Sequence, residues 1–310
     1  MAAVETDPMA GLPDVRGSYR FDAELSKTTW FRTGGHAEIL FRPADEDDLA
    51  SFMANRPLDT PVTVLGVGSN VLVRDGGIAG VTIRLGRGFA GIEVDGADLR
   101  AGAGVLDLNA AKAAAQAGIT GLEFLVGVPG TIGGAVRMNA GAYATELCDV
   151  LVSARAVDPR GSIHDLLPEH LGHGYRHCSV PEGWIFTACH MRGEMGLPAE
   201  IAARMEEIQA SRSSTQPIRE RTGGSTFKNP AGAKAWELID AAGCRGLRRG
   251  DAMVSERHCN FLINSGKASA TELEELGEEV RRRVFESQGV RLEWEIRRIG
   301  RHPASRRAAR

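Results

Sequence analysis

Glycine is concentrated in one stretch of this chain, and no other feature of the sequence constrains the fold as strongly. The 310 residues include 38 glycines, and 18 of these lie between Gly66 and Gly141. Glycine accumulates where the backbone must adopt a positive φ or approach another group closely. Two interpretations follow: a β-rich segment with many turns, or a backbone folded around a large polar ligand. The arrangement of the glycines decides between them.

Two glycine loops favour the ligand. The first, 66–70, follows an apolar run, and the second, 127–134, continues to 139–141. Consecutive N–H groups in such loops bind phosphate oxygens, and hydroxyl and amide side chains add donors. Neither loop is a Rossmann or Walker A motif, because Val71 replaces the third glycine and no Gly-Lys-Ser/Thr follows. The pair predicts a diphosphate held between two subdomains. The predicted cofactor-binding residues are Gly66, Gly68, Ser69, Asn70, Gly130, Thr131, Gly133, Gly134, Asn139 and Gly141.

The order of predicted elements indicates an α+β fold. Strands or hairpins are expected at 37–43, 61–70, 80–85, 91–104, 150–166, 184–193, 259–266 and 290–300, and helices at 44–55, 106–118, 199–211, 233–242 and 270–288. Asp45 is expected to cap the first helix, and Ser269 with Glu272 forms a capping-box pattern before the last. No alternation of strands and helices runs long enough to indicate a doubly wound parallel sheet. Residues 1–20 and 301–310 lack periodicity and are expected to be tails.

Composition excludes several classes of protein. A net charge of −3 gives no general attraction to nucleic acid or to an anionic membrane, and no apolar run is long enough to span a bilayer. The N-terminus lacks the basic segment and apolar core of a secretory signal. The five cysteines are scattered and never form a CxxC pair, which indicates a reducing cytoplasm. We therefore expect a cytoplasmic protein of two or three packed units, without a nucleic-acid or membrane partner.

Seven motifs occur in order along the chain: TTWFRTGG (28–35), VLGVGSNVLV (64–73), GLEFLVGVPGTIGGAVRMNAGAY (121–143), GYR (174–176), GSTFKNP (224–230), MVSERHCNFLIN (253–264) and LEWEIRRIG (292–300). Together they resemble the motifs of the UDP-N-acetylenolpyruvoylglucosamine reductase family over about residues 26–300. The run 127–143 is the most specific, because it is long and joins glycine, threonine and asparagine in a fixed order. The short span from Arg176 to Ser225 resembles the family's second type, which lacks an inserted tyrosine-bearing loop.

The resemblance implies a two-subdomain FAD-binding fold of the vanillyl-alcohol-oxidase (PCMH) type, followed by a C-terminal α+β substrate-binding domain. The expected boundaries are an N-terminal tail at 1–20, FAD-binding subdomains at 21–86 and 87–205, the substrate-binding domain at 206–300 and a basic tail at 301–310.

The resemblance also implies an activity in peptidoglycan precursor synthesis, and thus in cell-wall formation, cell shape and division. The family reduces UDP-N-acetylglucosamine enolpyruvate to UDP-N-acetylmuramate, with FAD as cofactor and NADPH as hydride donor. A monomer is expected.

Three catalytic residues follow from the resemblance. Arg176 matches the arginine that pairs with the substrate carboxylate, a role suited to a fork-shaped cation that keeps its proton. Ser225 matches the donor of the proton to the α-carbon, and Glu295 matches a glutamate near the enolpyruvyl group. Periodicity alone puts Glu293 and Glu295 on one face and does not choose between them; the family's motif does.

Tyr175, Lys228 and Asn229 are the predicted substrate-binding residues, because diphosphate and uracil need cationic and amide donors. His258 is interpreted as a structural histidine. The sequence departs from the family's pattern at Thr215, Ala144 and Trp294, where lysine, glycine and proline are usual.

Two other interpretations compete with this assignment. His170, His173, His177 and Cys178 lie close enough in sequence to suggest a metal site, but Gly172 and Gly174 interrupt the helix that would gather them. We therefore predict no metal. The alternative functions are a flavin oxidase or dehydrogenase of the same fold acting on another sugar or hydroxy acid, and a nucleotide-binding regulator without chemistry.

Overall fold

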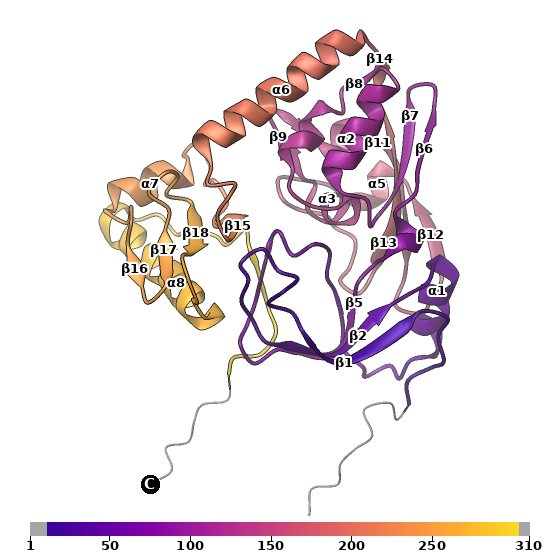
Figure 1. Cartoon of the computed structure of the whole chain (residues 1–310), viewed down its shortest axis with the longest axis horizontal. Helices are drawn as coiled ribbons and strands as arrows, with labels where there is room; N and C mark the ends of the chain where they lie inside the picture. Colours follow the sequence, from indigo (N-terminus) through magenta and orange to yellow (C-terminus); the bar gives the residue numbers. More distant parts are fainter. Residues whose placement is uncertain (1–10, 304–310) are drawn as a thin grey trace, which may run out of the picture. The chain divides into compact units, whose positions relative to one another are not determined.

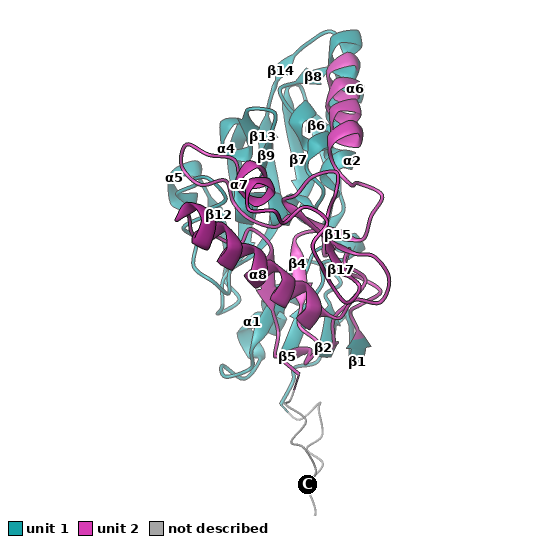
Figure 2. Ribbon diagram, turned by 90° about the vertical axis from the view of Figure 1, so that its left-hand side faces the viewer, with its two compact units in different colours: residues 1–23, 37–66, 79–202 teal, residues 24–36, 67–78, 203–310 magenta. Residues whose placement is uncertain are grey.

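The computed structural model describes residues 11–303. Residues 1–10 and 304–310, which belong to the two predicted tails, lie outside the described residues. The chain divides into two compact units (Figure 2). Unit 1 comprises Met1–Ala23, Ala37–Gly66 and Ala79–Ala202, and unit 2 comprises Glu24–His36, Val67–Ile78 and Ala203–Arg310. Each unit is thus assembled from segments that are distant in sequence.

The first sheet of unit 1 has the strand order β1-β2-β5-β3 (Figure 1). Its strands are β1 Ser18–Glu24, β2 His36–Arg42, β3 Val62–Val64 and β5 Ile78–Ile83. The strands predicted at 37–43 and 80–85 are confirmed. Of the predicted 61–70, Val62–Val64 is a strand, which runs parallel to β5, and the rest leads into the glycine loop. The prediction of a tail was wrong for residues 18–20, where β1 begins. Most of β1 is exposed, so it lacks the apolar alternation that marks a half-buried strand.

Helix α1, Glu46–Asn55, covers this sheet and begins as predicted. The Asp45 side chain accepts the N–H of Asp48, and this bond caps the helix. Leu49, Phe52 and Met53 are fully buried in a cluster that includes Phe41 of β2.

The second sheet of unit 1 is antiparallel and has the order β12-β11-β13-β7-β6. Its strands are β6 Ile92–Asp95, β7 Asp98–Gly102, β11 Leu151–Val157, β12 Ile163–Leu166 and β13 Ile185–Arg192. Both predicted hairpins and the predicted strand at 184–193 are confirmed. Helix α2, Asp107–Gln116, ends as predicted before Gly118, which has a φ of 73°. The shorter elements are η1 Arg87–Phe89, β8 Ile119–Thr120, η2 Glu123–Gly127, α3 Ile132–Met138, β9 Gly141–Ala142, β10 Thr145–Glu146, α4 Leu147–Val150, α5 Pro168–Leu171 and β14 Glu194–Met195.

Unit 2 contains a four-stranded sheet of order β15-β18-β17-β16 and a parallel pair, β4 with β19. The elements are β4 Val71–Val73, β15 Thr222–Ser225, α7 Ala235–Ala241, β16 Arg248–Arg249, β17 Ala252–Val254, β18 Phe261–Asn264, α8 Ala270–Gln288 and β19 Arg297–Ile299. Helix α8 has the predicted capping box and buries Leu273, Leu276, Val280 and Val284. Helix α6, Pro198–Thr215, extends beyond the predicted 199–211 and contains the sequence boundary between the two units.

The segment 290–300 is not the continuous strand that was predicted. Only β19 is a strand, preceded by one isolated bridge between Phe227 and Trp294. Leu292 and Ile296 are nevertheless fully buried in the core of unit 2. The alternation in sequence therefore reflects packing of one side of an extended segment, without a sheet around it.

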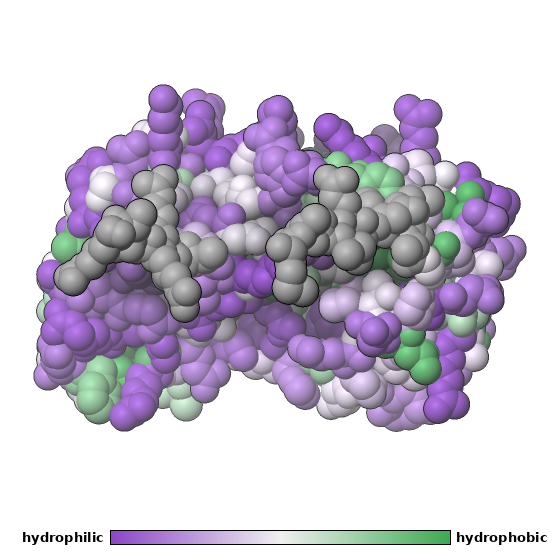
Figure 3. Space-filling model, turned by 90° about the horizontal axis from the view of Figure 1, so that it is seen from below, coloured by the Kyte–Doolittle hydropathy of each residue, from purple (hydrophilic) through white to green (hydrophobic). Residues whose placement is uncertain are grey.

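Within residues 11–303 no helix is long and apolar enough to cross a membrane. The face shown in Figure 3 is mostly hydrophilic, and its hydrophobic residues form separate small areas.

Candidate functional site

The first glycine loop offers free main-chain donors. Between residues 11 and 303, no protein acceptor receives a hydrogen bond from the N–H groups of Gly66 to Asn70. Gly68 has a φ of 70°, and a Cβ there would lie 2.8 Å from Cα of Thr29, so only glycine fits. Successive unpaired amides of this kind form an anion-binding concavity.

The second loop differs from the prediction of successive free amides. The N–H groups of Ile132 and Gly133 donate to the carbonyls of Val105 and Ala103, and the Gly130 carbonyl accepts the N–H of Asp107. Gly133 also leaves no room for a side chain, because a Cβ there would lie 2.9 Å from the Ala103 Cβ. Half of the loop is therefore fixed against residues 103–107, which leaves fewer amides for a ligand.

Within unit 1 the two predicted loops meet at Gly66 and Thr131. A Cβ on Gly66 would lie 3.0 Å from the Thr131 Oγ1. Thr131 is buried and precedes α3, in whose first turn Gly134 lies. The structure thus brings together Gly66, Thr131, Gly133 and Gly134.

Sequence reasoning missed a basic pocket of about 560 Å³ in unit 1. It is lined by Arg42, Pro43, Ala44, Arg84, Leu85, Gly86, Arg87 and Gly88. Burial and the nearby charge of Arg42 lower the pKa of the half-buried Arg84. Among the described residues, no carboxylate pairs with Arg42, Arg84 or Arg87. Arg84 directly follows β5, and Gly66 lies two residues after β3. Because β3 and β5 are parallel, their carboxyl ends lie at the same edge of the sheet, so the pocket and the first glycine loop lie at that edge. The available signal was an arginine at the end of each of two apolar runs, Arg42 as the last residue of β2 and Arg84 directly after β5.

Asn139 connects the second loop to the GYR motif. It is fully buried with a left-handed φ of 42°, and its amide nitrogen donates to Glu146 Oε2 at 2.8 Å and to the Gly174 carbonyl at 3.2 Å. Its amide oxygen accepts the N–H of Cys148 at 2.9 Å. Asn139 therefore fixes Gly174, the residue on which the next turn is built.

Tyr175 and Arg176 form the tip of a two-residue turn. Gly174 and His177 exchange both main-chain hydrogen bonds, at 3.2 and 3.0 Å, and Arg176 has a φ of 53°. This left-handed conformation costs a non-glycine residue roughly 1–3 kcal/mol, and such strain is concentrated at functional sites. The Arg176 guanidinium donates to the Gly141 carbonyl at 3.2 Å and lies 5.1 Å from the Tyr175 ring centre. The predicted residues Asn139, Gly141, Tyr175 and Arg176 thus form one cluster.

The histidines near this turn point to different partners. His170 Nδ1 accepts the N–H of Leu167, His173 Nε2 contacts the Val136 carbonyl, and His177 Nε2 contacts Ser179 Oγ. From residue 11 to residue 303, no three His, Cys, Asp or Glu side chains are arranged to hold a metal ion.

In unit 2, Ser225 lies at a β-bulge. Strand β15 pairs with β18 through Thr222 with Ile263 and Ser225 with Phe261, so β15 has one extra residue between these pairs. Gly224 has a φ of 80°, and a Cβ on Gly223 would meet the Phe31 ring at 2.5 Å. Gly224 is therefore favoured by its backbone conformation and Gly223 by the close approach of Phe31. Bulges often set the direction of a side chain beside an active site.

Glu295 lies beside the strand that carries Ser225. Its N–H donates to the Thr226 carbonyl at 2.9 Å, and its carbonyl accepts the amide of Asn70 at 3.3 Å. Glu295 is half-buried, whereas the Glu293 side chain is 78% exposed. Burial thus distinguishes the two glutamates that periodicity could not. Unit 2 brings together Asn70, the GSTFKNP segment and Glu295.

The other predicted residues of unit 2 have structural contacts. Lys228 lies 3.8 Å from the Glu293 carboxylate, and Asn229 Oδ1 accepts the N–H of Ala235 at the start of α7. Ser69 is buried. His258 also has contacts within the fold: its Nδ1 accepts the N–H of Asn260, its ring packs on Phe261, and burial lowers its pKa.

A buried carboxyl group lies below the second loop. Asp107 is the first residue of α2, and neither of its side-chain oxygens has a hydrogen-bond partner among the described residues. Burial raises the pKa of this carboxyl well above its ordinary value. Burial without a hydrogen-bond partner among the described residues therefore disfavours the ionised form of Asp107.

Known families match both units. The model of an FAD binding domain matches residues 37–167, and that of the C-terminal domain of UDP-N-acetylenolpyruvoylglucosamine reductase matches residues 216–299. A reductase of that name from Parvibaculum lavamentivorans is 60% identical over 93% of both chains. That of Rhodospirillum rubrum is 58% identical over 93% of this chain and 92% of its own.

Solved structures with a similar fold include a reductase of the same name. The crystal structure of UDP-N-acetylenolpyruvylglucosamine reductase from Thermus caldophilus has a TM-score of 0.80 at 36% identity, covering 93% of this chain and all of its own. The 6-hydroxy-D-nicotine oxidase of Arthrobacter nicotinovorans, at 14% identity, a TM-score of 0.55 and coverage of 95% and 90%, shares the fold. The predicted fold class, an FAD-binding fold with a C-terminal α+β domain, is confirmed. Identity of this extent along nearly the whole chain places it in the UDP-N-acetylenolpyruvoylglucosamine reductase family.

Proposed function

We propose that this chain is an FAD-dependent enzyme that reduces UDP-N-acetylglucosamine enolpyruvate to UDP-N-acetylmuramate, with NADPH as hydride donor, in peptidoglycan precursor synthesis. The observation that carries this proposal is 60% identity to a reductase of this name over 93% of both chains. The enzyme acts as a cytoplasmic monomer, with FAD-binding subdomains at 21–86 and 87–205 and a substrate-binding domain at 206–300.

The residues of the glycine loops fit FAD. Five consecutive amides, from Gly66 to Asn70, have no protein acceptor among the described residues, as a diphosphate requires. The half-buried Arg84, which has no carboxylate partner within residues 11–303, supplies positive charge at the same edge of the sheet. Ser69, Asn70, Gly130, Thr131 and the glycines that follow complete the FAD-binding set, with Asn139 and Gly141 supporting it. Bound there, FAD would supply the hydride transfer from NADPH to the vinyl carbon of the substrate.

Arg176 binds the substrate carboxylate. Hydride addition to the vinyl carbon moves negative charge into that carboxylate, and a bidentate guanidinium stabilises it. The turn of Gly174 to His177 holds the backbone of Arg176 in a strained conformation, which limits the directions that the side chain can take.

Ser225 gives the proton to the α-carbon, so that the hydride and the proton complete the reduction of the double bond. Serine is a weak acid, so cationic neighbours must stabilise the alkoxide that forms. Glu295, on the segment paired with Thr226, orients or polarises the enolpyruvyl group. Tyr175, Lys228 and Asn229 bind the UDP-sugar.

Anaerobic half-reactions test this function. NADPH should bleach the flavin absorbance of the purified enzyme, and UDP-N-acetylglucosamine enolpyruvate should restore it with one UDP-N-acetylmuramate formed per flavin. Protein that cannot bind FAD would contradict the proposal. Flavin reduced by a sugar or hydroxy acid and reoxidised only by dioxygen would instead indicate an oxidase.

A further inference from the structure

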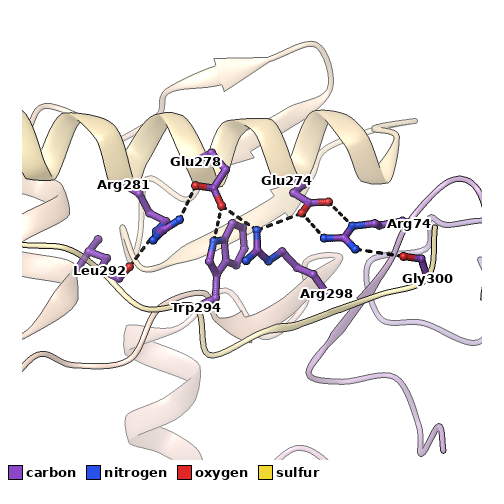
Figure 4. A network of polar contacts seen from close by, with 8 residues as sticks. All are labelled: Arg74, Glu274, Glu278, Arg281, Leu292, Trp294, Arg298 and Gly300. Atoms are coloured by element: carbon purple, nitrogen blue, oxygen red, sulfur yellow. Dashed lines mark hydrogen bonds and ion pairs between the residues drawn. The ribbon is translucent and has the colours of Figure 1, made fainter. Parts of the chain in front are cut away.

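Side chains from helix α8 hold the segment that carries Glu295 on one side (Figure 4). Glu274, Glu278 and Arg281 follow one another at helical spacing, so they lie on one face of α8. Arg281 donates to the Leu292 carbonyl at 2.9 Å, and Arg298 donates to Glu278 at 2.8 Å and to Glu274 at 3.1 Å. These bonds attach the segment to α8 on both sides of Trp294.

Trp294 lies at the centre of this network. Its indole N–H donates to Glu278 Oε1 at 2.8 Å, the oxygen that also accepts from Arg298. The Arg298 guanidinium lies 4.4 Å from the indole ring centre, a cation–π contact. The ring of Phe227, which lies two residues after β15, is 5.0 Å away. Trp294 is thus enclosed by a charged group, an aromatic ring and a carboxylate.

Gly277 completes the enclosure. It lies in the interior of α8, where glycine is less favourable than alanine by about 1 kcal/mol. A Cβ on Gly277 would overlap the six-membered ring of Trp294. The space left by this glycine is therefore used by the indole.

The enclosed ring lies next to a fixed stretch of backbone. The Glu293 carbonyl accepts the N–H of Lys228 at 2.9 Å, and the N–H of Glu295 donates to Thr226 at 2.9 Å. We propose that Trp294 is a positioning residue, whose enclosure by Gly277, Glu278, Arg298 and Phe227 sets the direction in which the Glu295 carboxylate leaves the backbone. This inference rests on the proposed catalytic role of Glu295.

Kinetics provide the first test. A misplacement of about 1 Å in a catalytic group costs as much as 100-fold in rate, so Trp294→Ala should slow flavin reoxidation by the enolpyruvyl sugar roughly 10- to 100-fold. Reduction by NADPH, FAD content and substrate KM should change less than about twofold, because the proposed contacts to these ligands come from other residues. Trp294→Phe and Glu278→Gln, which preserve packing, should each give a smaller loss in the same step. Trp236→Ala, an exposed tryptophan of α7 in the same unit, is the matched control.

A double-mutant cycle separates positioning from general damage. If Trp294 acts through Glu295, Trp294→Ala should have little further effect on reoxidation in a Glu295→Gln background. Additive losses would overturn the inference, as would normal reoxidation in Trp294→Ala, Trp294→Phe and Glu278→Gln alike. Normal reoxidation in Glu295→Gln alone would instead remove the catalytic role of Glu295, and the inference with it, while leaving the reductase function intact.

Gly277 provides an independent test. Gly277→Ala should displace the indole and slow the same half-reaction, and it should add little in the Trp294→Ala background, where the space is free. An equal effect of Gly277→Ala in both backgrounds would contradict the enclosure.

Discussion

The two units support their proposed catalytic side chains by different means. In unit 1, Arg176 lies at a turn with a positive φ, and its neighbours are main-chain carbonyls of Gly141 and Gly174 together with the buried amide of Asn139. In unit 2, Glu295 lies in an extended segment supported by the charged and aromatic side chains of Arg74, Glu274, Glu278, Trp294 and Arg298. The difference implies that backbone conformation controls the first site, whereas ion pairs control the second. Substitutions and pH should therefore affect the two units differently.

The largest expected effect concerns the chemistry that only unit 2 supplies. Ser225→Ala should slow flavin reoxidation by the enolpyruvyl sugar about 10²–10⁴-fold, the usual loss on removing a positioned general acid. Flavin reduction by NADPH should be nearly normal, since it needs no proton from Ser225. Stopped-flow absorbance at the flavin band separates the steps, and Ser287→Ala, on the exposed side of α8, is the control. Equal slowing of both steps would indicate a structural serine.

The next effect tests the ion pairs of unit 2. Glu274 is buried and accepts two hydrogen bonds of 2.9 Å from Arg74, and this pairing lowers the pKa of the carboxyl. Glu274→Gln should lower the free energy of unfolding by about 3–5 kcal/mol at neutral pH. Because the folded pKa is depressed, the stabilisation is present above the ordinary value of 4.5 and is lost as the pH falls through the folded pKa.

Thermal unfolding between pH 3 and 8 measures this loss. The control is Glu275→Gln, at the residue next to Glu274, which removes a solvent-exposed ion pair with Arg249. It should lower the free energy of unfolding by less than about 1 kcal/mol. Equal costs for the two variants would show that burial does not matter here.

Asp107 in unit 1 should respond to pH with the opposite sign. Its folded pKa is raised, so the folded state binds this proton more tightly, and the carboxyl destabilises the fold increasingly as the pH rises above about 3.8. Asp107→Asn should match the natural protein near pH 4 and exceed it by roughly 1–3 kcal/mol at pH 8. A variant that is less stable at pH 8 would mean that Asp107 has an unrecognised partner when ionised.

The smallest effect tests backbone strain in unit 1. Tyr143 and Ala144 join β9 to β10 with φ values of 54° and 65°, as in a type I′ turn, whose second position favours glycine. Ala144→Gly should therefore stabilise the protein by roughly 1 kcal/mol, or about 2 °C in Tm. Ala142→Gly, in the adjoining strand, should destabilise it. If both changes act alike, the strain at Ala144 is not significant.

Local signals in the sequence predicted much of the fold. The Asp45 cap and the capping box of Ser269 and Glu272 fixed the starts of α1 and α8, because these bonds form between near neighbours. Strand β1 was missed because an exposed edge strand carries no alternation. The alternation in 290–300 predicts a strand, because an extended segment that packs one side against α8 has the same period of two residues as a strand in a sheet.

The identities of the candidate site residues could be predicted from specific motifs. Their backbone conformations and packing could not. The family's motifs predict Arg176, Ser225 and Glu295 as site residues. No sequence pattern predicts that Arg176 has a positive φ or that the Trp294 ring occupies the space beside Gly277. The hydrogen bonds of Ile132 and Gly133 to residues 103–105 could not be predicted from the sequence either, because they join segments that are distant in sequence. Contacts of this kind depend on the tertiary fold.

The pairing of β4 with β19 affects when the first glycine loop can fold during synthesis of the chain. Arg74, directly after β4, binds the carbonyl of Gly300, 226 residues later in sequence. At about 5–20 residues per second, β4 waits roughly 10–45 s during synthesis for its partner strand. The first glycine loop, which leads into β4, spends that interval without its final support. We therefore expect FAD to be acquired only after residue 300 has emerged from the ribosome, and nascent chains stopped before β19 should remain colourless.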